Sequence, residues 1–267
     1  MMEQFRRVVE VNVGGKTFRS KDLYIEFDVP FDDDASPNES VIRIYNLTQD
    51  TISRIKRNDV LTINAGYEGD VGLLLSGRVS YVSTRKDGPD KVTSIYVLDS
   101  SDLSGVKLEK RAYAAGVTGQ AILRDLVPLL KVPIAAFRLP KNKTYAKGYT
   151  VTGSIIDHIE EVAKDCGAAC YMNRGKLYIR PITDGDDARF VLRNDTGLVG
   201  SPERFEDSDG VKGYHIECLL QHRITTASII DLESKFVRGR FRVRRGRHVC
   251  NMDTFLTTAE VIESAGR

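Results

Sequence analysis

Alternation with a period of two dominates both ends of this 267-residue chain and most strongly limits its possible folds. In the first hundred residues, runs rich in β-branched and aromatic residues are separated by Gly, Pro, Asn and Asp. Neighbouring side chains of a strand point to opposite faces, so each run can bury one face. Strands joined by short turns predict a closed or nearly closed antiparallel barrel, which leaves no exposed sheet edge. The runs lie at residues 8–13, 24–29, 41–45, 60–65, 73–83 and 92–98.

One short helix is expected among these strands, at residues 49–57. The hydroxyl of Thr48 can accept a hydrogen bond from a free backbone N–H at its start. Ile52 and Ile55 are spaced to share one face. We therefore expect this helix to plug one end of the barrel.

The pattern changes near residue 116 and changes back near residue 185. Apolar residues recur at helical spacing over 118–130 and 154–166, and Ser154 can cap the second helix. Two strands are expected at 169–172 and 176–181. Strand patterning returns at 189–192, 212–220, 228–232 and 236–249, followed at 254–265 by an exit strand or a short helix.

This order predicts a mainly β fold with an α/β insert. Two antiparallel β-barrel domains, 1–107 and 185–267, flank a small α/β domain at 108–184.

Composition excludes several classes of protein. The formal net charge is +2 and 41% of residues are hydrophobic, so the chain can form cores and is not a polyelectrolyte. No run approaches the eighteen apolar residues of a membrane span, and no secretory signal is visible. Four cysteines are too few for a disulfide framework in a chain of this length, so reduced thiols are expected.

Candidate catalytic and metal-binding residues are few. Cys166, Cys170, Cys218 and His222 have the spacing of a zinc set, which makes a metal-dependent enzyme one alternative. His158 lies beside acidic residues in a predicted helix, yet no motif of a hydrolase surrounds it. Buried free cysteines and hydrogen-bonded histidines explain these residues better, so we predict no catalytic residue, no cofactor and no metal site.

The sequence GGKT at residues 14–17 resembles the end of a phosphate-binding loop. However, Glu10 stands where that loop needs a glycine, and a strand rather than a helix follows. The Gly14-Gly15 pair is better explained as a hairpin turn.

The most unusual segment is the basic run FVRGRFRVRRGRHV at residues 236–249. Alternation within a strand places four arginines on one face and apolar residues on the other. We predict that this face is at least partly exposed and contacts acidic side chains of a neighbouring subunit. A second alternative is an oligonucleotide-binding barrel that uses the strand Arg238–Arg247, although few aromatic residues for base stacking lie near it. The predicted interface residues are Arg238, Arg240, Arg242 and Arg244.

Residues 36–67 read SPNESVIRIYNLTQDTISRIKRNDVLTINAGY. This stretch resembles the first domain of bacteriophage tail and baseplate hub proteins. The shared features are a Pro-Asn loop, a strand ending in Asn-Leu-Ser/Thr, a short helix and a strand ending in Ala-Gly-Tyr. The next pieces of the family domain are similar to LLLSGRVSYVS and to VLDSSDL.

The rest of the chain carries the same resemblance. The family's small α/β unit is similar to VTGSIIDHIEEVAKDCGAACYMNRGKLYIRP. Its second barrel is similar to the final third, which contains GLVGSPERFED, YHIECLLQHRI and FVRGRFRVRRGRHVCNMDTFLTTAEV.

The resemblance implies a structural protein of a phage virion rather than an enzyme. It implies a homotrimer in which two similar barrels per subunit form a ring with near-sixfold symmetry. That ring would join a hexameric tail tube to a trimeric spike or tip, with the tape-measure protein ending in or near its lumen. Membrane and sequence-specific nucleic acid are not expected among its partners.

Overall fold

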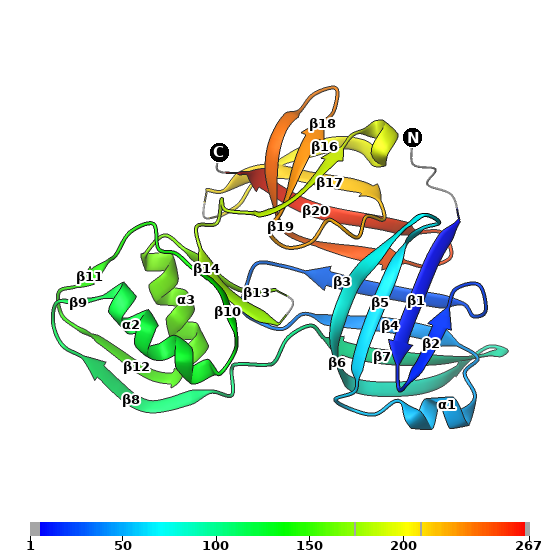
Figure 1. Ribbon diagram of the computed structural model, residues 1–267, viewed down its shortest axis with the longest axis horizontal. Coiled ribbons are helices and arrows are strands. Elements are labelled where there is room, and N and C mark those ends of the chain that lie inside the picture. Colours follow the sequence, from blue (N-terminus) through cyan, green and yellow to red (C-terminus); the bar gives the residue numbers. More distant parts are fainter. Residues whose placement is uncertain (1–5, 174, 209, 265–267) are drawn as a thin grey trace. The chain divides into compact units, whose positions relative to one another are not determined.

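The computed structural model describes residues 6–173, 175–208 and 210–264 and divides the chain into two compact units (Figure 1). The first unit joins the described residues of 1–32, 38–99 and 185–267, and the second joins residues 33–37 and 100–184. The first and last of the three expected domains therefore lie in a single unit. No helix in the described part of the chain is long and apolar enough to cross a membrane.

The first unit is built on one sheet, with thirteen strands in its described residues. Its strands are β1 (Arg7–Val13), β2 (Lys16–Arg19), β3 (Ile25–Phe31), β4 (Glu39–Tyr45), β5 (Val60–Tyr67), β6 (Asp70–Asp87), β7 (Asp90–Leu98), β15 (Asp186–Leu192), β16 (Leu198–Glu206), β17 (Lys212–Leu219), β18 (Ser228–Glu233), β19 (Arg238–Cys250) and β20 (Phe255–Glu263).

The strand order along this sheet is β16-β17-β20-β19-β3-β4-β7-β6-β5-β1-β2, with β18 pairing to β19 and β15 to β18. The mainly β fold is confirmed, and the number of barrels stays a prediction. The sheet is not split into two, because the pairing runs as one path from β16 to β2. The physical reason is β3, which pairs with β4 through Ile25–Asp28 and with β19 through Phe27–Phe31. One strand thus connects the N-terminal and C-terminal parts of the sheet (Figure 1).

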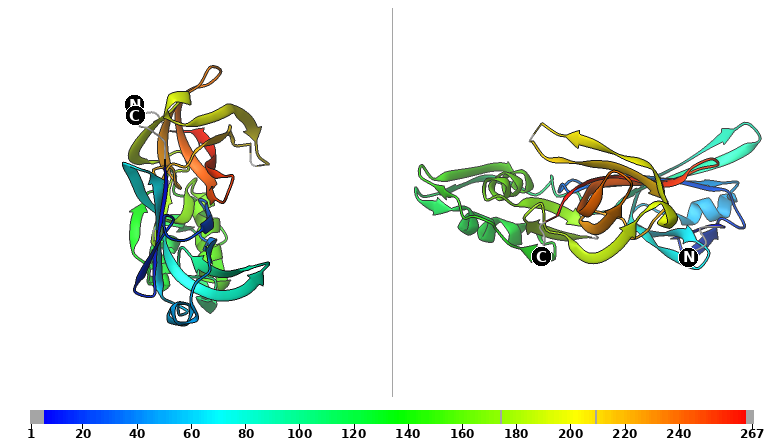
Figure 2. Two further views of the ribbon diagram at one scale, coloured as in Figure 1. Left: turned by 90° about the vertical axis from the view of Figure 1, so that its right-hand side faces the viewer. Right: turned by 90° about the horizontal axis from the view of Figure 1, so that it is seen from above.

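Two hairpins stand out in this sheet, a tight one between β1 and β2 and a long one between β6 and β7. Val13 pairs with Lys16, so Gly14 and Gly15 form a two-residue hairpin turn, and both have positive φ angles. The ladder between β6 and β7 continues to Asp87 and Asp90, beyond the ends of the neighbouring strands (Figure 2). The hairpin prediction at Gly14-Gly15 is confirmed.

The short helix α1 (Gln49–Arg54) begins where the sequence predicts. The Thr48 hydroxyl accepts a hydrogen bond from the backbone N–H of Thr51. Ile55 is buried and Ile52 is partly buried against the adjacent hydrophobic cluster. The helix is shorter than expected, because Ile55 already has extended backbone angles.

Two hydrophobic clusters fill the first unit. The first contains the alternating apolar residues of β1, β3, β4, β5 and β7, and it also includes Leu220, Cys250 and Phe255 from the last third of the chain. The second combines Phe31 of β3 with residues of β15 to β20. Each cluster therefore needs residues from both ends of the chain, which is why these ends form one unit. A 3-10 turn, η2 (Asn194–Thr196), lies between β15 and β16.

The second unit is the expected α/β insert with its own core. Its helices α2 (Gly119–Leu126) and α3 (Ile155–Asp165) each bury one apolar stripe, and the Thr118 hydroxyl caps α2. Ser154 stands at the cap position of α3 but makes no capping hydrogen bond with its side chain. The elements are β8 (Lys107–Tyr113), β9 (Val117–Thr118), α2 (Gly119–Leu126), the 3-10 turn η1 (Val127–Leu130), β10 (Ile134–Phe137), β11 (Thr144–Tyr145), β12 (Tyr149–Ser154), α3 (Ile155–Asp165), β13 (Ala169–Asn173) and β14 (Lys176–Arg180).

Candidate functional site

The predicted arginine row lies in the first part of β19, but its members differ widely in exposure. Arg238 is exposed, and 35% of the Arg240 side chain is accessible. Only 16% of the Arg244 side chain is accessible, and Arg242 is fully buried. The expectation that all four lie at least partly exposed on one face is therefore wrong for Arg242.

Two features of β19 explain this difference. Phe241, Arg242 and Val243 follow one another and are all buried, so both faces of the strand are covered at that point. The ladder with β20 then shifts register between Val243 and Arg245, which leaves Arg244 as an extra residue. A β-bulge of this kind puts two residues opposite one and moves the alternation by one position. The arginine face consequently continues through odd-numbered residues after the bulge.

Most arginines of β19 meet carboxylates of the same chain. Each of these ion pairs has a short contact between a guanidinium nitrogen and a carboxylate oxygen, so the acid that was expected from a neighbour is supplied within the unit. The pairs are Arg240–Asp231 at 3.0 Å, Arg244–Asp207 at 2.7 Å, Arg245–Glu260 at 2.7 Å and Arg247–Asp28 at 2.8 Å. Among the described residues, Arg238 takes part in no such pair.

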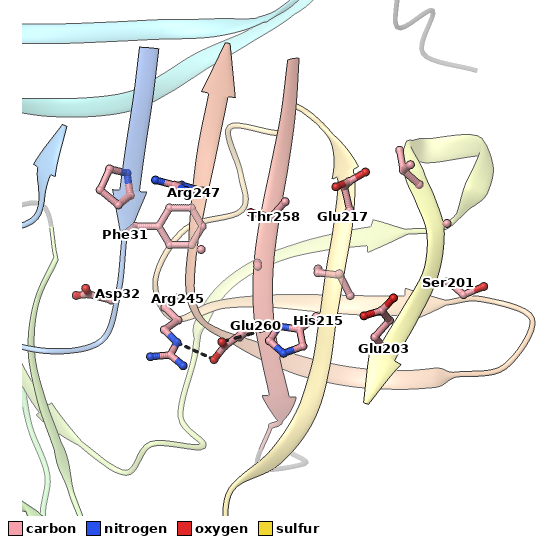
Figure 3. Close-up of a pocket in the computed structure, with 16 residues that line it drawn as sticks. Phe31, Asp32, Ser201, Glu203, His215, Glu217, Arg245, Arg247, Thr258 and Glu260 are labelled. Carbon is pink, nitrogen blue, oxygen red and sulfur yellow. Dashed lines mark hydrogen bonds and ion pairs between the residues drawn. The ribbon is translucent and has the colours of Figure 1, made fainter. Parts of the chain in front are cut away.

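A row of polar residues crosses four strands at the bulge. Glu203 of β16 lies opposite His215 of β17, His215 opposite Glu260 of β20, and Glu260 opposite Arg245 of β19. Directly opposite residues of adjacent strands lie on the same sheet face, so their side chains interact. Arg245 Nε donates to Glu260 Oε2, while His215 Nδ1 is 3.8 Å from Glu260 Oε1 (Figure 3).

A cavity of about 630 Å³ borders this row (Figure 3). It is lined by residues from β3, β16, β17, β19 and β20. The apolar residues Phe31, Val199 and Ile216 contribute to its lining, and four carboxylates outnumber two guanidinium groups. The lining includes no cysteine, and it combines apolar surface with an excess of negative charge. Such a cavity is suited to binding a cationic and apolar group. The carboxylates are those of Asp32, Glu203, Glu217 and Glu260.

The structure does not bring the four candidate zinc ligands together. Cys166 and Cys170 belong to the second unit, whereas Cys218 and His222 belong to the first. All four cysteines are buried and free, and burial raises the pKa of the Cys218 thiol to about 12. Within the described residues, no three His, Cys, Asp or Glu side chains gather in a way that could hold a metal ion.

His158 has a structural environment in the second unit. Its Nδ1 atom is 2.8 Å from the hydroxyl of Tyr149, which also donates to Glu161 at 2.7 Å. Its Nε2 atom lies against the backbone of Thr152. Both ring nitrogens are thus engaged in holding α3 against β12.

A second polar cluster joins β6 to the segment after β17. Arg223 donates two hydrogen bonds of 2.7 Å to the carboxylate of Asp70 and so lowers the pKa of that carboxyl group. His222 Nε2 lies 3.8 Å from Asp70, and burial lowers the pKa of His222. A side chain at Gly72 would begin only 2.1 Å from His222 Cδ2. The ring of His222 therefore lies directly on the backbone of β6.

A comparison with protein-family models found one match, described as "Baseplate hub gp41", over residues 38–239. This match includes most of the first unit's strands and the whole insert from residue 100 to residue 184. A search of curated proteins found no match.

Solved structures share the fold at low sequence identity. A 43 kDa tail protein of prophage MuSo2 from Shewanella oneidensis aligns with a TM-score of 0.66 and 10% identity, covering 96% of this chain and 98% of that one. A tail protein from Neisseria meningitidis aligns with a TM-score of 0.64 and 11% identity, covering 97% of each chain. The E. coli c3393 protein, described as a type VI secretion component similar to T4 tail proteins gp27 and gp5, aligns with a TM-score of 0.63 and 8% identity, covering 96% and 78%.

Proposed function

The chain belongs to the baseplate hub gp41 family, and from this premise we propose that it is a structural subunit of the baseplate hub in a phage or phage-like tail. Three copies form a ring that adapts a hexameric tail tube to a trimeric spike or tip. The observation that carries this proposal is the family match, which includes residues 100–184 of the second unit and residues 38–99 and 185–239 of the first.

The two hydrophobic clusters of the first unit support the proposed symmetry. One is centred on the N-terminal strands and the other on the C-terminal strands. A ring of three chains therefore contains six such clusters around one axis. A ring of this kind can face a sixfold neighbour on one side and a threefold neighbour on the other.

The proposed partners are the tail tube protein, the spike or tip protein and the tape-measure protein, and the proposed location is the virion. The tail proteins among the solved structures and the type VI secretion component support a role in such an assembly. We propose no enzymatic activity, because the pairing of a hydroxyl with a histidine at Thr257 and His248 is buried within the sheet, whereas the polar row and ion pairs of the described residues are suited to binding.

The alternative of oligonucleotide binding through the strand Arg238–Arg247 is less well supported. Binding to the phosphates of a nucleic acid requires guanidinium groups that are free to contact them. Arg240, Arg244, Arg245 and Arg247 already hold carboxylates of the same chain. We propose instead that exposed members of this strand, above all Arg238, contact a neighbouring protein.

Imaging of the assembled tail by cryo-electron microscopy tests this function. We expect three copies of the 29.8 kDa chain around a threefold axis, between the tube and the spike. A particle that places the chain elsewhere, or with another symmetry, overturns the proposal. As a control for nucleic acid, the purified chain should show no salt-sensitive binding to single-stranded DNA at physiological ionic strength.

A further inference from the structure

The turn between β18 and β19 presents an exposed aromatic side chain. Phe236 is 73% exposed although it is large and apolar. The side chain of Ser234 holds this turn, because its hydroxyl accepts from the N–H of Val237 at 2.9 Å and donates to the carbonyl of Val237 at 3.1 Å. The Ser234 hydroxyl also accepts from the N–H of Phe236 at 3.3 Å. The aromatic group is thus displayed on an ordered turn and loses little freedom on binding.

Positive charge is in excess beside this aromatic group. The ammonium group of Lys235 lies over the Phe236 ring, 5.5 Å from its centroid. Arg238 is exposed and has no ion pair among the described residues, and Glu233 lies directly opposite it in the ladder between β18 and β19, so two cationic side chains stand against one carboxylate at this turn. The turn at residues 234–237 together with Arg238 is called the cationic tip below. Its chemistry requires a partner surface that is apolar, concave and acidic.

The cavity beside β16 and β17 has that chemistry. Its lining includes Phe31, Val199 and Ile216, and its carboxylates exceed its guanidinium groups. Glu203 and Glu217 lie in this lining, and neither has an ion pair in the described part of the chain. Two carboxylates are therefore available to Lys235 and Arg238.

The cationic tip does not reach this cavity in its own copy. The strand β19 runs extended from Arg238 to the cavity wall at Arg245. A strand rises about 3.3 Å per residue, so this path is roughly 20 Å long. Only another molecule can bring a cationic tip to the cavity.

We propose that the cationic tip of one copy docks into the acidic cavity of a second copy of this chain, with Phe236 as the anchor. The two surfaces differ, so the contact is heterologous, and successive contacts close into a ring when the rotation fits. This inference rests on the proposed function in one respect, because the ring of three supplies the second copy. It adds which two surfaces meet within that ring.

A photo-cross-linking amino acid at position 236 tests the contact directly. Full-length chains carrying it are incorporated into tails from a mixture of ¹⁴N- and ¹⁵N-labelled copies, and mass spectrometry then separates intermolecular from intramolecular products. We expect intermolecular cross-links to residues 199–203 and 215–217. Intermolecular products confined to other surfaces, or none at all, overturn the proposal.

Charge reversal provides an independent measurement on folded protein. The pair Lys235→Glu and Arg238→Glu should lower incorporation into particles, as should Glu203→Lys with Glu217→Lys. All four changes in one chain should restore incorporation if the two surfaces meet. Failure of this rescue, with each chain shown to be folded by circular dichroism, contradicts the contact.

A matched control uses Met252, which is 75% exposed at another turn of the same unit. Phe236→Ser should weaken copy-to-copy binding about 30-fold, as expected for an aromatic anchor, whereas Met252→Ser should change it less than threefold. Equal effects of the two changes refute the anchor role.

The outcomes separate this inference from the proposed function. A threefold ring whose tip cross-links elsewhere removes the inference and leaves the function intact. A tip-to-cavity cross-link in a particle without threefold symmetry does the reverse.

Discussion

Acid should destabilise this protein through His248, a buried residue of β19. The ring is 1% exposed, and its Nδ1 atom lies 2.8 Å from the hydroxyl of Thr257. The pKa of His248 is lowered to about 3, mainly because burial penalises the imidazolium form and to a smaller extent because of the nearby ring of His222. In the unfolded chain the pKa is that of an ordinary histidine, about 6.5.

The direction of the effect follows from where the proton binds. Above pH 6.5 the residue is neutral in both the folded and the unfolded state, so it does not change the free energy of unfolding with pH. Between pH 6.5 and pH 3 the unfolded chain binds a proton that the folded chain does not, so the free energy of unfolding falls as the pH falls. At pH 4.5, two units below the unfolded pKa, this amounts to about 3 kcal/mol.

Urea denaturation at pH 7.5 and pH 4.5, on the wild-type chain and on His248→Gln, measures this quantity. Glutamine keeps a polar amide near Thr257 but does not titrate. The wild-type chain should lose about 3 kcal/mol more than the variant between the two pH values. Contributions from Asp70 and other groups are present in both chains and cancel in the comparison.

The same experiment on His215→Gln is the control, because 52% of the His215 side chain is accessible. That variant should keep the full acid sensitivity of the wild-type chain. If His248→Gln and the wild-type chain lose equal stability, the neutral buried histidine is refuted as the source.

Three further predictions concern contacts that join the two ends of the first unit. Phe255→Ala should lower the free energy of unfolding by about 3–5 kcal/mol, measured by urea denaturation, because the ring is 2% exposed in the first hydrophobic cluster. Asp70→Asn should cost about 1–2 kcal/mol at pH 7 by removing the charge that Arg223 binds. Since the pKa of Asp70 is lowered, that difference should persist down to the ordinary carboxyl pKa and vanish as the pH falls through the lowered value. Gly72→Ala should lower the free energy of unfolding by about 1–3 kcal/mol, and with it the melting temperature, because the new methyl group meets His222. An unchanged melting temperature would contradict this packing.

Local elements were the part of the fold that the sequence could predict. A capped helix after Thr48, a two-residue turn at Gly14-Gly15 and a helix ending before Gly167 all depend on interactions within a few residues. Their determinants are visible in a short window of sequence. The mainly β composition with an α/β insert follows from the same local periodicities.

The pairing of strands distant in sequence could not be predicted in this way. β3 alternates buried and partly exposed residues, and this pattern is satisfied by any partner that covers the apolar face. In the structure Phe27 pairs with Cys250 on one side and with Ile42 on the other. Nothing within residues 25–31 distinguishes a partner nearby from one more than two hundred residues away. For this reason the sequence did not reveal that both ends of the chain share one sheet.

The role of Arg238, Arg240, Arg242 and Arg244 as an interface stays a prediction, but simple alternation did not identify which arginines of β19 share a face. Strict alternation from Arg238 selects even-numbered residues, whereas the cavity is lined by Arg245 and Arg247. The adjacent Arg244-Arg245 pair interrupts the alternation, because neighbouring positions of a regular strand do not share a face. A bulge at this doublet lets both residues find carboxylates, Asp207 for the first and Glu260 for the second. A doublet of like charges inside an alternating run is therefore a sequence signal for a bulge, and here that bulge lies in the wall of the acidic cavity.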